Sequence, residues 1–242
     1  MYCLAVDTTT NYLCVVIARD GEVVCEYNRL KERAHSKYLI PVVEKVLLRC
    51  GLSIADMDYF TAGIGPGSFT GLRIGIAAVK AMAMAYDKPV VGYSSLELLA
   101  LQSNVRDGLV CPVIDAKRQQ VYSAVYEFDK RKGLRRKGKY LLVPIDDLLK
   151  KLRGRILFIG DAVALYRENI CRNKSIIAEF APKKLWYPAP QAVARLCGML
   201  YEKNDIKTAD TITPLYMYAD TCTVRKASKE KKVSSKQTTR EG

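Results

Sequence analysis

The amino-acid sequence predicts an α/β fold in two lobes, each built on a mixed β-sheet flanked by helices. Short apolar runs alternate with segments of helical periodicity, a pattern typical of α/β proteins. The order of expected strands and helices in the first half of the chain begins again in the second half. With 242 residues, 49% of them apolar and 26% charged, the chain is also long enough to bury a substantial core.

In the first half, three strands are followed by helices and strands in alternation. The pair Asp20-Gly21 is typical of a tight turn and predicts that the second and third strands form a hairpin. Gly51 follows an apolar helical face and predicts the end of the first helix. The expected elements are strands at residues 2–6, 13–18, 23–28, 59–62 and 88–92, and helices at about 36–50, 69–86 and 95–102.

The second half starts in the same way. An apolar run at residues 109–115 ends in Asp115 as the first strand ends in Asp7, and a new strand begins six residues after each aspartate. A three-strand meander that then alternates with helices, present twice, predicts two ribonuclease-H-like halves with mixed sheets. The remaining expected elements are strands at 121–125, 139–143 and 155–159, and helices at about 145–152, 162–171 and 191–203.

The net charge of +14 is concentrated in two short segments. Residues 130–139 hold seven basic and no acidic side chains, and residues 225–242 hold seven basic and two acidic ones, so the rest of the chain is nearly neutral. Such blocks favour RNA through counterion release, and Arg135, Arg136 and Lys137 are the expected contacts. A solvated hairpin tip and a solubilising tail remain the alternative. We expect a first lobe at 1–104, a second at 105–223 and a disordered basic tail at 224–242.

The cysteines and the N-terminus indicate a cytoplasmic protein that is not associated with a membrane. Eight cysteines are scattered without a CxxC pair, which argues against a zinc site and fits reduced thiols in a reducing compartment. The chain enters an apolar strand at once, without a secretion signal. The longest apolar helix is too short and too charged to span a membrane.

A glycine-rich segment joins the fourth expected strand to the longest expected helix. Four glycines fall between residues 63 and 71, and Ser68 is placed to cap the helix. The segment is not a P-loop, which needs Lys and Ser or Thr after its last glycine, and Thr70 replaces the third glycine of a dinucleotide loop. Two interpretations remain open: a tight turn into a helix buried within its own chain, or a helix that contacts a second protein.

Small side chains recur along this helix at spacings of three and four residues, which would let another helix approach closely. Glycine costs about 1 kcal/mol relative to alanine inside a helix, so glycines here need a reason in packing. We expect a partner interface that consists of Gly71, Arg73, Gly75, Ala78, Lys80 and Met82.

Five segments resemble the TsaB/YeaZ family and together span roughly residues 1–218. The most specific is Gly65-Pro-Gly-Ser-Phe-Thr-Gly-Leu-Arg-Ile-Gly75, and the others lie at residues 4–10, 112–118, 187–193 and 213–216. The resemblance implies the actin-like ATPase fold in two lobes. The chain departs from the family after residue 216, where Met217-Tyr218 stands in place of the usual arginine.

The resemblance also implies a function. Members of this family are the non-catalytic partners of TsaD in bacterial synthesis of threonylcarbamoyladenosine (t6A), the modified nucleoside beside the anticodon of tRNAs that read codons beginning with A. The chain is thus expected to be a scaffold or activator that acts with a TsaD-like catalytic subunit, a TsaE-like ATPase and tRNA, while TsaC makes the threonylcarbamoyl-adenylate donor. It is expected to carry no cofactor of its own. A homodimer when alone, and ATP or ADP at the interface within the complex, stay open.

The residues themselves offer little catalytic chemistry. The catalytic paralogue holds a metal with two histidines spaced HxxxH, whereas this chain has the single histidine His35, with Leu39 four residues on. We therefore expect no catalytic residue and no metal site, with His35 as a surface or capping residue. The alternative is a free-standing actin-like phosphotransferase or a peptidase-like enzyme. The candidate nucleotide or phosphate contacts, by position in actin-like kinases, are Asp7, Thr8, Thr9 and Asp115.

Overall fold

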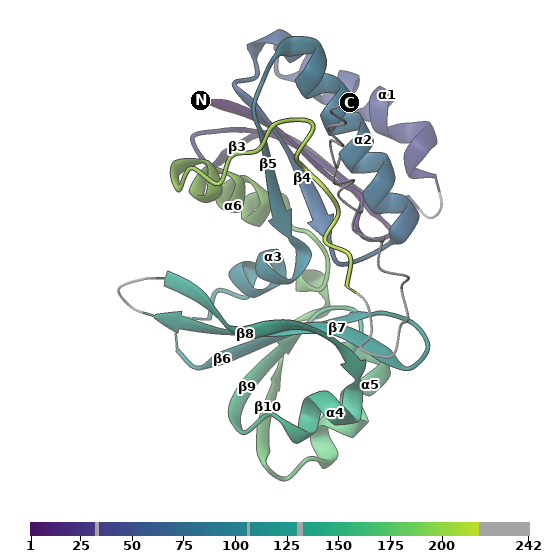
Figure 1. Cartoon of the computed structure of the whole chain (residues 1–242), viewed down its shortest axis with the longest axis vertical. Helices are drawn as coiled ribbons and strands as arrows, with labels where there is room; N and C mark the ends of the chain where they lie inside the picture. The colour runs from purple at the N-terminus through teal and green to yellow at the C-terminus, as the bar shows by residue number, and fades with distance from the viewer. Residues whose placement is uncertain (32–33, 106, 130–132, 218–242) are drawn as a thin grey trace, which may run out of the picture.

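The computed structural model describes residues 1–31, 34–105, 107–129 and 133–217, which form two lobes (Figure 1). The first lobe holds a five-stranded sheet in which the first three strands form an antiparallel meander and the later two strands run parallel to the first. Its elements are β1 (Tyr2–Asp7), β2 (Tyr12–Arg19), β3 (Glu22–Leu30), α1 (His35–Arg49), β4 (Tyr59–Gly65), α2 (Phe69–Tyr86), β5 (Val90–Ser94) and α3 (Ser95–Gln102).

The second lobe repeats this pattern around its own five-stranded sheet. Its elements are β6 (Leu109–Asp115), β7 (Gln120–Asp129), β8 (Gly133–Pro144), α4 (Ile145–Lys150), β9 (Gly154–Ile159), α5 (Val163–Arg172) and β10 (Ile176–Phe180). The chain then continues into α6 (Pro190–Glu202). The sequence did not predict β10, a five-residue edge strand that pairs in parallel with β9.

The two sheets have the same topology. The first has the order β3-β2-β1-β4-β5 and the second the order β8-β7-β6-β9-β10. The central strand of each sheet is antiparallel to its hairpin neighbour and parallel to the strand on its other side. The expected α/β fold of two ribonuclease-H-like halves, the actin-like ATPase fold, is therefore confirmed.

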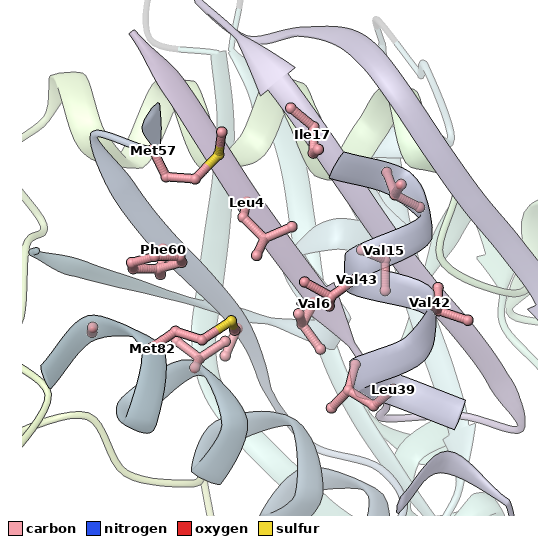
Figure 2. Packing of buried hydrophobic residues seen from close by; sticks show 14 of the residues in the cluster. Leu4, Val6, Val15, Ile17, Leu39, Val42, Val43, Met57, Phe60 and Met82 are labelled. Atoms are coloured by element: carbon pink, nitrogen blue, oxygen red, sulfur yellow. The ribbon is translucent and has the colours of Figure 1, made fainter. Parts of the chain in front are cut away.

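Alternate residues of β1 face opposite sides of the first sheet, as the pleat of a strand requires. Leu4 and Val6 pack beneath α1 and α2, next to Phe60 and Met82 (Figure 2). Cys3 and Ala5 instead join the cluster that α6 covers. Both faces of this sheet are therefore buried, and α1 and α2 share one of them.

The last described part of the chain returns to the first lobe, so the expected boundary of 105–223 for the second lobe is wrong. α6 lies against the first sheet because its apolar face covers the side that α1 and α2 leave open (Figure 1). Lys207 then pairs with Val90 through backbone hydrogen bonds of 2.7 and 2.8 Å, and Ile212 is fully buried in the first core. The expected tail at 224–242 lies outside the described residues.

Candidate functional site

The turn that follows β1 lies directly beneath the start of α2. The backbone N–H of Ser68 donates to the Thr9 carbonyl oxygen at 2.7 Å, and the Thr8 hydroxyl donates to the Gly71 carbonyl oxygen at 2.7 Å. A Cβ atom at Gly71 would lie 1.9 Å from the Thr8 carbonyl oxygen, and one at Gly75 would lie 2.3 Å from Thr8 Oγ1. These glycines are therefore required by the close approach of the chain's own turn.

The prediction that Gly71 and Gly75 contact a partner is wrong for this reason. Met82 belongs to the same correction, since it is only 8% exposed and packs in the first core (Figure 2). Arg73 is exposed, while Ala78 and Lys80 are half-buried. Sequence periodicity could not separate the two sides of α2, because apolar and small residues cover nearly its whole surface.

The outward side of α2 carries a different row of residues, spaced by four, of which the sequence analysis singled out only Arg73. It consists of Phe69, Arg73, Ala77 and Ala81, and Met84 extends it by a further turn. Phe69 is 55% and Met84 67% exposed. The spacing of four from Phe69 was the signal that could have found this row.

The first turn of that row is held by a cation–aromatic contact. The Arg73 guanidinium carbon lies 3.9 Å from the centre of the Phe69 ring, and its Nε donates to the Tyr216 hydroxyl at 3.3 Å. Phe69 and Tyr216 have ring centres 5.8 Å apart. Arg73 is thereby fixed in place on the surface of the first lobe.

Helix α1 adds exposed apolar side chains beside this row. Ile40 is 48% and Leu48 83% exposed. Because α1 and α2 lie side by side on the same face of the first sheet, their solvent sides point the same way (Figure 1). We refer to the following set as the α1–α2 face: Ile40, Leu48, Phe69, Arg73, Ala77, Ala81 and Met84.

The Asp7 carboxylate at the end of β1 is buried and hydrogen-bonded within its own chain. It accepts hydrogen bonds from the Thr9 backbone N–H at 2.8 Å, the Thr9 hydroxyl at 2.7 Å and the Tyr93 hydroxyl at 2.7 Å. Burial raises the pKa of Asp7, and the hydrogen bonds from Thr9 and Tyr93 oppose that shift. Asp7, Thr8 and Thr9 are at most 2% exposed, so in this structure they hold the turn and are not open to a nucleotide, contrary to expectation.

Asp115 occupies the corresponding position in the second lobe. Its carboxylate accepts from the Lys117 backbone N–H at 2.8 Å, as Asp7 accepts from Thr9, and it pairs with Lys117 Nζ at 2.6 Å. Its own backbone N–H donates to the Asp161 carboxylate at 3.0 Å. Burial raises the pKa of Asp161. Asp115 remains partly exposed and stays a candidate ligand contact.

The space between the two aspartate turns is nearly filled by side chains. The cavity there has a volume of about 10 Å³, room for roughly one water molecule. Its walls include Thr9, Ile114, Asp161 and Trp186. This cavity therefore has no room for a nucleotide in this structure.

A metal site does not arise from the donor atoms of the described residues. No group of three or more His, Cys, Asp or Glu side chains among them converges on one point. His35 begins α1, is 7% exposed, and has Nε2 2.8 Å from the Thr10 carbonyl oxygen. It is therefore buried, and since the N-cap of α1 is Ala34 without a side-chain cap, His35 is neither the surface residue nor the capping residue expected from sequence.

The basic residues of the second lobe lie in a strand instead of at a hairpin tip. Arg135, Arg136 and Lys137 belong to β8, which begins earlier than the sequence predicted. Lys137 Nζ lies 3.2 Å from Glu127 Oε2, and the Arg136 guanidinium carbon lies 3.9 Å from the centre of the Tyr140 ring. Lys139 also belongs to β8, and the remaining basic residues of that block, 130–132, lie outside the described part.

Comparison with known proteins identifies a family model and relatives that match this chain. The family model for TsaD, tRNA N6-adenosine threonylcarbamoyltransferase, matches residues 28–219. The chain is 33% identical over 213 residues to the tRNA threonylcarbamoyladenosine biosynthesis protein TsaB of Bacillus subtilis, covering 85% of this chain and 90% of that protein. The protein of the same name in Escherichia coli is 36% identical over 132 residues, which are 54% of this chain and 57% of that one.

A solved structure agrees with the fold. YeaZ from Pseudomonas aeruginosa superimposes with a TM-score of 0.75 at 24% identity, covering 89% of this chain and 99% of that one. Within the described residues, no helix is both long and apolar enough to cross a membrane.

Proposed function

Because this chain belongs to the TsaB/YeaZ family, we propose that it is a non-catalytic subunit required for t6A synthesis on tRNAs that read codons beginning with A. The burial and hydrogen bonding of Asp7 support the proposal that the chain is non-catalytic. Its carboxylate, at the position where an actin-like kinase orients metal and phosphate, is buried and accepts three hydrogen bonds from its own chain. Freeing it would leave Thr9 and Tyr93 without their acceptor.

The α1–α2 face is the docking surface of this proposal for a TsaD-like catalytic subunit. Exposed Phe69 and Met84 supply large apolar contacts, and Ala77 and Ala81 between them leave room for a partner helix. Arg73, held over the Phe69 ring, offers a charged group at the edge of the contact. The same surface would pair two copies of the chain when the partner is absent.

The remaining components act through that complex. A TsaE-like ATPase and tRNA bind the assembled pair, and this chain carries no nucleotide or metal of its own. The nearly filled cavity between the aspartate turns supports this part of the proposal, and ATP or ADP at the interface would then be held largely by other subunits. We propose a cytoplasmic location, where tRNA is modified.

The alternative of a free-standing enzyme gains no support from the site. A phosphotransferase would need an accessible carboxylate at Asp7, and a peptidase would need a histidine base. The Nε2 atom of His35 instead lies at hydrogen-bond distance from the Thr10 carbonyl oxygen.

Reconstitution tests the proposed function. Purified chain, TsaD-like subunit, TsaE-like ATPase, TsaC product, ATP and unmodified tRNA are combined, and t6A is measured by mass spectrometry of the digested RNA, with each protein omitted in turn. We expect t6A only when both this chain and the TsaD-like subunit are present. Equal t6A without this chain, or t6A from this chain with donor, ATP and tRNA alone, would overturn the proposal.

A further inference from the structure

We propose that the edge strand β8 is a contact surface for the phosphate backbone of tRNA, an inference that rests on the proposed function. The strand lies at the outside of the second sheet and pairs with β7 on one side only. Residues 135–139 of this strand include the exposed basic side chains Arg135, Arg136, Lys137 and Lys139. Neighbouring residues of a strand face opposite sides of the sheet, so Arg135 and Lys137 lie on one side of this edge and Arg136 on the other. Together with Lys139 they place four positive charges within five residues of a free sheet edge, a strip that matches a polyanion in charge.

The acidic groups near this strip balance only part of its charge. Glu127 pairs with Lys137 at 3.2 Å and also lies opposite Arg135 in the β7–β8 register. Glu97 of α3, which interacts electrostatically with Arg136, is largely buried. Asp129 ends β7 opposite Gly133, at the end of β8 where the strip begins, so it can balance at most one further charge. Excess positive charge therefore remains along the exposed edge.

Arg136 is already held in an orientation suited to a phosphate. Its guanidinium lies over the Tyr140 ring, and its Nε donates to the Gly138 carbonyl oxygen at 3.1 Å. A guanidinium presents five N–H donors in a fixed plane, so one can be used internally while the terminal nitrogens bind phosphate oxygens. A lysine in its place would lack both the stacking and the paired donors.

A groove continues the strip toward the first lobe. It has a volume of about 430 Å³ and runs between β8 and residues 215–217, with Lys139, Tyr140, Lys151 and Tyr216 among its lining residues. Two lysines and two tyrosines suit a nucleic-acid strand, because phosphates pair with the ammonium groups and ribose or bases pack on the rings.

The groove also connects the strip to the α1–α2 face. Tyr216, which lines the groove, accepts the hydrogen bond from Arg73 and packs against Phe69. An RNA lying on β8 would therefore reach the edge of the surface where the catalytic subunit is proposed to dock. The strip would hold part of the tRNA while another part enters the partner's active site.

Other occupants of this edge fit less well. Lysines on an edge strand also protect it from pairing with other strands, and that role alone would need no groove or stacked arginine.

The test measures tRNA binding by the pair of this chain and the TsaD-like subunit across a salt series, using fluorescence anisotropy of a labelled, unmodified tRNA that reads codons beginning with A. The variant is Arg135→Ala/Arg136→Ala/Lys139→Ala. The matched control, Lys174→Ala/Lys183→Ala/Lys184→Ala, removes the same charge from exposed residues outside β8. If three phosphate contacts are lost, the slope of log affinity against log salt should fall by roughly 2–3, and affinity by roughly 100-fold at 0.15 M salt.

The t6A assay then separates this inference from the proposed function. For the β8 variant we expect a higher KM for tRNA with little change in kcat, and Arg136→Lys should retain only part of the wild-type affinity. Normal t6A formation with tRNA binding equal to that of the control would overturn the inference and leave the proposed function intact. Loss of pairing with the TsaD-like subunit at unchanged tRNA affinity would show that β8 contacts protein instead, and would also overturn it. If the pair does not form with wild-type chain, the same salt series on the isolated chain decides the inference.

Discussion

Replacing Gly71 with alanine should destabilise the isolated chain. An added Cβ would lie 1.9 Å from the Thr8 carbonyl oxygen, so the turn after β1 would have to retreat by more than about 1 Å to reach the separations usual for Cβ atoms. Backbone, not a flexible side chain, stands in the way. The shift would also strain the Thr8–Gly71 and Ser68–Thr9 hydrogen bonds.

The magnitude follows from these parts. Overpacking lowers the free energy of unfolding by about 1–3 kcal/mol, and weakening the two hydrogen bonds lowers it by about 1 kcal/mol each. The better helix propensity of alanine offsets about 1 kcal/mol of this loss. The free energy of unfolding should therefore fall by about 2–4 kcal/mol, or roughly 5–15 °C in melting temperature for a chain of this size.

Thermal melting followed by circular dichroism is the assay, and Ala77→Leu on the outward side of the same helix is the control. Ala77 is exposed, so that variant should melt within about 2 °C of wild type, as surface changes usually do. A Gly71→Ala chain that melts as late as wild type would refute the packing described here. It would return the inner side of α2 to the set of candidate interfaces.

Four further predictions concern the stability and the pH dependence of the turn at Asp7, the metal and the docking surface. Asp7→Ala should lower the free energy of unfolding by about 2–4 kcal/mol, because the Thr9 and Tyr93 donors lose their acceptor; urea titration checks this, and an unchanged midpoint would contradict it. Burial raises the pKa of Asp7 above its usual 3.8, so the contribution of Asp7 to the free energy of unfolding should fall as the pH rises from 3.8 through the raised value. The stability of Asp7→Asn should lack this fall. Stability curves of wild type and Asp7→Asn that run parallel over this pH range would contradict the prediction. The purified chain should contain no stoichiometric iron or zinc and should melt at the same temperature with or without EDTA, as elemental analysis and melting curves can establish. Met84→Asp should leave the fold intact but reduce pairing with the TsaD-like subunit at least tenfold by calorimetry, whereas equal affinity would exclude this part of the α1–α2 face.

The sequence predicted the local elements of this fold well where strong local signals were present. The bounds of α2 agree with expectation at both ends, and Ser68 caps the helix by accepting from the Gly71 N–H at 3.2 Å. The repeat of a strand that ends in aspartate revealed the two related sheets. β10 was missed because five residues at a sheet edge carry little periodicity, and β8 was taken as too short because lysines and arginines are tolerated on an edge strand.

Long-range packing explains what could not be predicted. That α6 covers the first sheet depends on which apolar face was left open after α1 and α2 had docked, and local sequence does not encode this. The same limit applies to Gly71 and Gly75, whose spacing revealed a close approach but not that Thr8 of the same chain makes it.

The most direct test of the central claim, that this chain acts by docking on a catalytic partner, is t6A formation by the TsaD-like subunit as a function of added chain. Wild type is compared with Ala81→Arg, which places a long charged side chain in the middle of the α1–α2 face. We predict that t6A rises to saturation with wild type and stays near the level without chain for Ala81→Arg, although both melt at similar temperatures. Equal stimulation by the two proteins, or full activity with neither, would contradict the account.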